Sequence, residues 1–388
     1  MSPRTRRTVL WFSAPVVVFA VLGGFLSKAT AREETYQHLK VFEEVVRLIS
    51  DHYVEKVNDD KVMLGALTGL AESLDPDSAF LTAEQVKQIE SGTPLPNGEV
   101  GIDLTRQYYL RVLATRDGSP AAKAGIRTGD YIRTIGESAT REMSVHEGMR
   151  LLRGAPGSKV KLTVMRGGAT EPHTIELTRE TSQAPDVTSR MQSAGVGYLR
   201  VASIGAKTAD LVKAQAADLV KGGASTILVD VRRTSGGSPE HGLALARVFI
   251  GQGTLAMREA KGAPRESITA KAPDGAISQA AVVLIDNGTS GAAELFAAAL
   301  SGNKRAELVG ERTIGRAAQQ RLVKLPDGTG LWLTTTRYLM PDGSPLHEKG
   351  LEPAVPVDEP EVDFGQTPPP GDPILEKAVE HATQKKAA

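Results

Sequence analysis

The sequence predicts a multi-domain protein that combines a layered α/β core, a compact β module and a small helical segment. From about residue 196 onward, continuous apolar strands alternate with helices, which is typical of parallel strands buried on both faces. Between residues 96 and 182, short strand-like runs surround one short helix, which is typical of a small β domain. The length of 388 residues also exceeds what one small domain requires.

Composition and charge exclude several classes of protein. Apolar residues make up 40 % of the chain and charged residues 24 %, which is ordinary for a globular protein and excludes a disordered one. The 46 Lys and Arg residues balance 46 Asp and Glu residues, whereas a general nucleic-acid-binding protein carries a basic excess. The chain has no cysteine, so disulfides, thiolate metal sites and a cysteine nucleophile are excluded. No motif supports a metal or an organic cofactor, and we expect none.

The first 31 residues predict a signal peptide or a membrane anchor. Basic residues within the first seven positions precede an apolar run from Val9 to Leu26. As a helix this run is about 27 Å long, just enough to span a bilayer core, and the basic flank favours export of the rest of the chain. Ala29-Thr30-Ala31 has the small-x-small pattern of a cleavage site, so the segment is either removed or kept as an anchor.

Residues 32–95 predict a small helical segment. Apolar periodicity places helices at Thr35–Ile49 and at about Asp59–Glu72, and Pro76 prevents the second from continuing. Thr82 begins a further helix, with Gln85 positioned for a capping box. Glycines and prolines between residues 91 and 98 then mark a domain boundary.

The spacing of apolar residues also predicts the elements of the two larger regions. In 96–182, a helix at about Val145–Leu152 interrupts the expected strands Val100–Leu104, Leu110–Ala114, Tyr131–Ile135, Val160–Met165 and Thr174–Leu177. In 183–358, strands and helices alternate at Val196–Val201, Lys207–Lys221, Thr226–Asp230, Pro239–Ile250, Ala281–Asp286 and Ala292–Leu300, before a Thr-rich strand at Leu331–Leu339. The remainder, 359–388, is expected to be a Pro-rich linker and a closing helix from about Ile374.

Several motifs resemble, in order along the chain, those of one protein family. They are Leu74-Asp75-Pro76-Asp77-Ser78, Gly118-Ser119-Pro120-Ala121, Asp230-Val231-Arg232 with Gly236-Gly237, Ala293-Glu294-Leu295, Gln320 and Pro341-Asp342-Gly343. Together they make the sequence similar to the carboxyl-terminal processing proteases, serine peptidases of family S41 with an inserted PDZ domain. The resemblance covers nearly the whole chain after residue 35. It implies a PDZ domain at 96–182 and a layered serine-peptidase core of the crotonase-like type at 183–358.

The resemblance also implies peptide binding, because PDZ domains bind C-terminal or extended peptides by adding a strand beside an exposed sheet edge. The residues expected to bind peptide are Val100, Gly101, Ile102, Val145, Met149 and Leu152. The first three correspond to the loop that receives the peptide carboxylate. The last three fall at i, i+4 and i+7 of the neighbouring helix, where they either line the groove or are ordinary core residues.

Partners and location follow from the same reasoning. We expect the chain to bind polypeptide C-termini or extended peptides, and to associate with an active protease relative or with further copies of itself. With the N-terminal segment taken into account, we expect the periplasmic side of a bacterial cell envelope. The chain would be anchored in the inner membrane, or secreted after signal cleavage.

The two catalytic positions of the family hold different residues here. The family's serine nucleophile lies three residues before a glutamate, which is Glu294 in this sequence, and that position is Gly291. Its lysine general base follows a Phe-Gly pair, which is Ile314-Gly315 here, and the next residue is Arg316. Glycine has no atom to attack a carbonyl, and an arginine stays protonated. We therefore expect a pseudoprotease that acts as a scaffold or regulator.

Neighbouring positions leave alternatives open. Ser290 is either the relocated nucleophile of an active serine endopeptidase or a helix N-cap, and we favour the cap. His241 is either a general base or a solvated or capping group, and we favour the second interpretation. Gly236, Gly237 and Ala292 correspond to the family's oxyanion-hole region, although the two glycines equally suit a tight turn.

The charge of Arg316 also needs an explanation. A guanidinium that faces a helix N-terminus is unfavourable unless it pairs with a carboxylate. Glu294 and Glu311 are the candidate partners. The same guanidinium also suits a bidentate contact with a peptide carboxylate.

Overall fold

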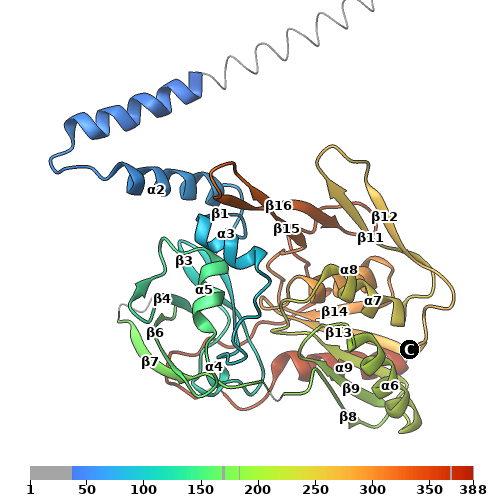
Figure 1. Cartoon of the computed structure of the whole chain (residues 1–388). Coiled ribbons are helices and arrows are strands. Elements are labelled where there is room, and N and C mark those ends of the chain that lie inside the picture. The colour runs from blue at the N-terminus through green and yellow to red at the C-terminus, as the bar shows by residue number, and fades with distance from the viewer. Residues whose placement is uncertain (1–36, 168–170, 183, 368, 388) are drawn as a thin grey trace, which may run out of the picture. The chain divides into compact units, whose positions relative to one another are not determined.

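The computed structural model describes residues 37–167, 171–182, 184–367 and 369–387 (Figure 1). The predicted targeting segment, 1–31, lies outside the described residues. The chain divides into two compact units, 1–69 and 70–388. In the described part of the chain, no helix is both long enough and apolar enough to cross a membrane.

The first unit contains a helix over 37–52 and most of α2 (Asp59–Glu72). The two helices that the sequence predicts in this region are thereby confirmed, and the first ends at His52, three residues beyond the predicted Ile49. Large apolar side chains of the first helix, among them Leu39 and Val45, are exposed.

A short strand near the start of the second unit was not expected from the sequence. β1 (Ala79–Leu81) pairs antiparallel with β16 (Gly330–Leu339), and all three of its residues are buried. The region 32–95 is therefore not purely helical as expected, because this short apolar run completes a sheet of the core. α3 (Ala83–Glu90) follows, and Thr82 and Gln85 form the predicted capping box.

The β module is one antiparallel sheet with two short helices. Its strand order is β2-β3-β4-β6-β7, with β5 beside β4, so β2 lies at a free edge of the sheet. The helix α5 (Val145–Leu152) matches its predicted bounds and packs against β2. The other elements are β2 (Ile102–Gln107), β3 (Tyr109–Thr115), α4 (Pro120–Lys123), β4 (Tyr131–Ile135), β5 (Ser138–Ala139), β6 (Lys159–Met165) and β7 (His173–Thr178).

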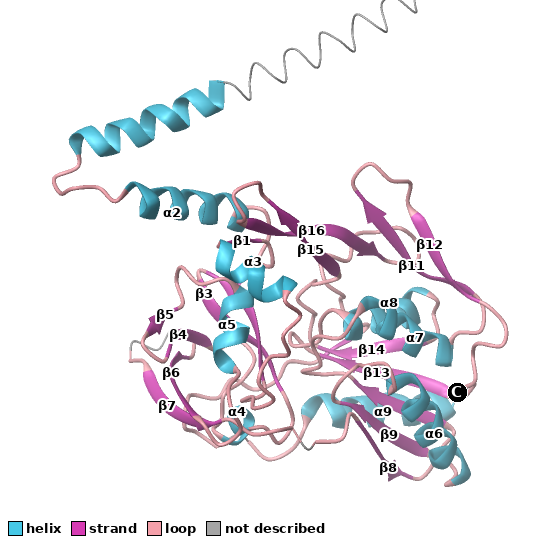
Figure 2. Cartoon of the chain, viewed as in Figure 1, coloured by secondary structure: helices cyan, strands magenta, loops and turns pink. Residues whose placement is uncertain are grey.

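The core is a six-stranded sheet between two layers of helices, in the order β17-β14-β13-β10-β9-β8 (Figure 2). All neighbouring strands are parallel except β8 and β9, which confirms the predicted layered α/β core. Helices α6, α7 and α8 pack on one face and α9 packs on the other. The bounds are β8 (Val187–Ser193), β9 (Val196–Val201), α6 (Thr208–Lys221), β10 (Thr226–Asp230), α7 (Pro239–Phe249), β13 (Ala280–Ile285), α8 (Ala292–Gly302), β14 (Ala306–Gly310), β17 (Val355–Pro356) and α9 (Pro373–Ala387).

A third sheet, also antiparallel, completes the core. Its order is β1-β16-β11-β12, and β15 pairs with β16. Only β16 matches a predicted strand. The missed strands β11 (Gly253–Ala260), β12 (Glu266–Ala270) and β15 (Ala318–Lys324) are partly exposed and contain many polar residues, so their apolar pattern is weak.

Candidate functional site

The glycine loop after β10 and the start of α8 lie together. Gly291 is the N-cap of α8 and has φ 58°, a conformation that favours glycine. A Cβ atom at Gly291 would lie 3.7 Å from the carbonyl oxygen of Gly236, so the site has space for a side chain. At Gly237 a Cβ would lie 2.3 Å from the carbonyl oxygen of Ile204 and 3.3 Å from the Cβ of Ala292. The structure therefore brings the three residues of the predicted oxyanion region next to the nucleophile position.

The predicted capping role of Ser290 is wrong. The N-cap of α8 is Gly291, which has no side chain to form a capping hydrogen bond. Ser290 precedes the cap and is 2 % exposed, and its N–H donates to the carbonyl of Thr234 at 3.1 Å. In the described part of the chain, no lysine or histidine side chain is hydrogen-bonded to Ser290.

His241 is not a capping residue either. Ser238 caps α7, and its Oγ accepts the backbone N–H of His241 at 3.3 Å. The half-buried His241 therefore lies in the first turn of the helix. Among the described residues, its ring has no hydrogen bond to a serine that would indicate a nucleophile and base pair.

Arg316 pairs with a carboxylate that the sequence analysis did not consider. Its Nε lies 3.0 Å from Oδ2 of Asp77, and its Nη2 contacts Oδ1 of the same carboxylate. Its Nη1 donates to the carbonyl of Leu104 at 3.0 Å. The expected pairing with Glu294 involves only the backbone N–H of Arg316, and Glu311 instead accepts the N–H of Glu359. The motif that contains Asp77 was visible in the sequence, but its contact with residue 316 was not.

Glu294 links the start of α8, which follows Gly291, to the backbone at Arg316. It lies in the first turn of α8 and is completely buried. Its carboxylate accepts the N–H groups of Gly315 at 2.9 Å and of Arg316 at 2.7 Å, and also the hydroxyl of Thr313. Burial raises the pKa of Glu294 to about 7, although these donors favour the ionised form.

A buried ion cluster lies at the end of β10, directly before the glycine loop. Asp230, at the end of β10, accepts from Nη2 of Arg232 and from the hydroxyl of Tyr198, both at 2.7 Å. Burial alone would raise the pKa of Asp230, but Arg232 and Arg200 outweigh it and hold the pKa well below its usual range. Arg232 also binds Asp372 at 2.7 Å, which ties the residues before α9 to the loop.

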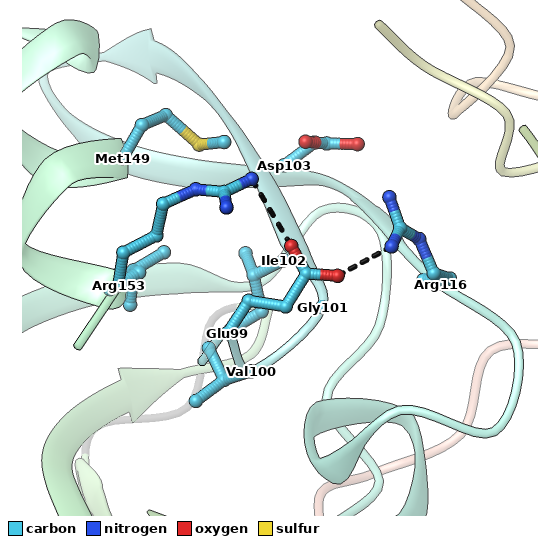
Figure 3. A pocket seen from close by; sticks show the side chains of 9 residues that line it. Glu99, Val100, Gly101, Ile102, Asp103, Arg116, Met149 and Arg153 are labelled. Carbon is cyan, nitrogen blue, oxygen red and sulfur yellow. Dashed lines mark hydrogen bonds and ion pairs between the residues drawn. The ribbon is translucent and has the colours of Figure 1, made fainter. Parts of the chain in front are cut away.

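A second candidate site lies in the β module, between the start of β2 and α5. One pocket is lined by five of the six expected peptide-binding residues, namely Val100, Gly101, Ile102, Met149 and Leu152 (Figure 3). Val145, the sixth, packs against the core of the module and does not line this pocket. Leu152 is only 2 % exposed, so it is also part of the hydrophobic core of the module.

The structure adds charged residues to this pocket. Glu99 lies between two arginines: Nη2 of Arg153 is 3.2 Å from its Oε2, and Arg116 contacts its other oxygen (Figure 3). Asp103 also lines the pocket. Both guanidinium groups beside the expected carboxylate loop are paired with the carboxylate of Glu99. Neither arginine was among the residues expected to bind peptide, although Arg153 lies directly after the predicted helix.

The β module is joined to the core next to the glycine loop. The hydroxyl of Ser235 donates to the carboxylate of Asp103 on β2. Nε of Arg200 lies 2.7 Å from Oδ2 of Asp117. In the part of the chain that the structure describes, no cluster of three or more histidine or carboxylate side chains could hold a metal ion.

Comparisons with known proteins agree with this architecture. The sequence model of Peptidase family S41 matches residues 195–357, and that of the PDZ domain matches residues 111–166. The carboxy-terminal processing protease CtpA of Bacillus subtilis (strain 168) is 31 % identical over 323 residues, which cover 82 % of this chain and 68 % of that protein. This chain belongs to the carboxyl-terminal processing protease family.

Other members of the family show the same extent of similarity. The carboxy-terminal-processing protease of Bartonella bacilliformis is 29 % identical over 362 residues, covering 91 % of this chain and 83 % of that protein. Among solved structures, a photosystem II D1 C-terminal processing protease superimposes with a TM-score of 0.68 at 27 % identity. The match covers 82 % of this chain and 92 % of that one. The predicted family and fold class are thus confirmed.

Proposed function

We propose that this chain is a pseudoprotease of the family, which binds polypeptide C-termini through its PDZ domain and does not cleave them. Acyl transfer by a serine and a lysine needs a hydroxyl to attack the carbonyl and a neutral amine to accept its proton. Gly291 offers no hydroxyl. The observation that carries the proposal is the pairing of Arg316 with Asp77, because this contact requires a charged guanidinium that cannot act as a base.

Peptide binding is supported by the sheet edge and by the charges beside it. β2 has one free edge, α5 lies next to it, and apolar side chains line the pocket at its start. Arg116 and Arg153 supply positive charge where a terminal carboxylate would lie. As a scaffold or regulator, the chain would present bound tails to an active protease relative, or hold them away from it.

The test uses the purified protein in two assays. We expect no cleavage of an unfolded protein and no labelling by a fluorophosphonate probe, together with measurable binding of peptides that carry a free C-terminal carboxylate. Labelling of Ser290, with peptide cleavage lost in Ser290→Ala, would instead indicate an active endopeptidase with a relocated nucleophile. Absence of any peptide binding would remove the scaffold function.

We also propose that the chain acts in the bacterial cell envelope, on the periplasmic side. This rests on the basic and apolar character of residues 1–31. Protease added to spheroplasts should degrade the protein without lysis, whereas protection until lysis would refute this location. The mass of the isolated protein shows whether residues 1–31 are removed.

A further inference from the structure

Along β2, the backbone N–H and C=O groups of alternate residues point toward β3 and toward the free edge of the sheet. The carbonyl of Gly101 accepts the N–H of Arg116, so residue 101 faces β3. The irregularity in the pairing of β2 and β3 adds a residue to β3, which leaves the alternation along β2 regular. Ile102 and Leu104 therefore carry their N–H and C=O groups on the free edge, where an added peptide strand would pair.

One of these free-edge groups is already occupied. Nη1 of Arg316 donates to the carbonyl of Leu104 at 3.0 Å, while the rest of the guanidinium holds Asp77. The contact is well shielded, because the side chains of Arg316 and Asp77 are only 22 % and 9 % exposed. Beside it, Ser235 binds the carboxylate of Asp103. Contacts from the core thus reach β2 at Asp103 and Leu104.

We infer that Arg316 is a specificity-determining residue that ends the peptide groove at Leu104. The inference rests on the proposed function, which places the peptide carboxylate at residues 100–102. A bound tail would then pair with Ile102 and reach Leu104 about two residues before its own C-terminus. Further pairing is prevented there, so the groove accepts only the last few residues of a C-terminus and discriminates against extended internal segments.

The planar guanidinium is what permits this double contact. An arginine offers five N–H donors in a fixed plane, so one edge can bind a carboxylate while another N–H binds a carbonyl. A lysine carries a single compact ammonium group and lacks this geometry. The residue that replaces the family's general base therefore has a role of its own in recognition.

The experiment compares peptides of different length. An array of eight-residue peptides with free C-termini is screened with the wild-type protein, and the best binder is shortened from its N-terminus to five and three residues. For the wild type, we expect the eight- and three-residue forms to bind with similar affinity. In Arg316→Ala and Arg316→Lys, the eight-residue form should bind roughly five-fold more tightly than the three-residue form, because one more backbone hydrogen bond becomes available.

Two of the variants control for misfolding and for general effects of removing an arginine. Arg316→Lys keeps a charge beside Asp77 if Arg316→Ala fails to fold. Arg312→Ala removes an exposed arginine that binds the carbonyl of Lys349, and it should keep the wild-type length dependence. If the wild type already binds longer peptides more tightly, and neither substitution at 316 changes that length dependence, the inference about Arg316 is refuted while the proposed function stands. An array without any binder would refute the proposed function, and the inference with it.

Discussion

At the residue scale, Arg316 carries a positive charge that it does not lose near neutral pH. The guanidinium of Arg316 is held by Asp77 and by the carbonyl of Leu104, so it joins three separate segments of the second unit. Sequence spacing predicts that Gly291 and Arg316 stand at the positions of the family's nucleophile and general base. It could not identify Asp77, because 239 residues separate it from Arg316 and no local pattern links them.

Removal of the Asp77 charge should destabilise the protein. Asp77→Asn leaves a largely buried guanidinium without its carboxylate, which costs about 1–3 kcal/mol in the free energy of unfolding. Urea denaturation measures this change. Glu352→Gln is a matched control, because Glu352 pairs with Arg312 at the exposed surface and its loss should cost less than about 0.5 kcal/mol. Equal effects of the two substitutions would contradict the structural role of Asp77.

Glu294 should make the stability depend on pH. Its pKa is raised from 4.5 to about 7, so the folded protein retains a proton that the unfolded chain releases. The free energy of unfolding should therefore fall as the pH rises from about 4.5 to 7, by about 3 kcal/mol from this group. Urea denaturation of the wild type and of Glu294→Gln across this range isolates the contribution. Parallel pH profiles for the two proteins would show that Glu294 does not titrate in this way.

At the scale of elements, the turn before α8 and the glycine loop lie next to each other. Strands and helices with strong apolar periodicity, such as β9, β10 and α5, were predictable from the sequence. The cap of α8 was not, because the choice between Ser290 and Gly291 depends on a positive φ that only the folded chain reveals. β1 was missed because its three residues are stabilised by pairing with a distant strand.

Gly291 and Gly237 should differ in how much an alanine substitution destabilises the protein. Gly291→Ala introduces backbone strain of about 1–3 kcal/mol, but its Cβ meets no close atom. Gly237→Ala adds a clash with the carbonyl of Ile204 to a similar strain and should cost clearly more. The midpoints of thermal unfolding show which of the two variants is less stable. A more stable Gly237→Ala than Gly291→Ala would contradict the described packing of the loop.

The arginine pair beside β2 should recognise the peptide carboxylate. Arg116→Ala combined with Arg153→Ala removes both guanidinium groups that now hold Glu99, and we expect at least a ten-fold loss of affinity for a free C-terminus. Fluorescence anisotropy with the same peptide in carboxylate and amide forms measures the effect. An equal loss for the amidated peptide would mean that the arginines only support the fold of the pocket.

At the scale of the whole molecule, an S41 peptidase core and a PDZ domain are combined in one chain. The fold class could be predicted because strand and helix patterns persist over nearly the whole chain, and the family because its motifs occur in order. The connections between the PDZ domain and the core could not, since they depend on single contacts such as Ser235 with Asp103.

The most direct measurement is cleavage of an unfolded protein by the wild type and by the double variant Gly291→Ser, Arg316→Lys. A Cβ atom at Gly291 meets no atom closer than 3.7 Å, although the positive φ strains any side chain there, and Glu294 links the start of α8 to residue 316. We predict that the wild type is inactive and that the double variant cleaves the substrate and reacts with a fluorophosphonate. Cleavage by the wild type at the rate of the double variant would contradict the account.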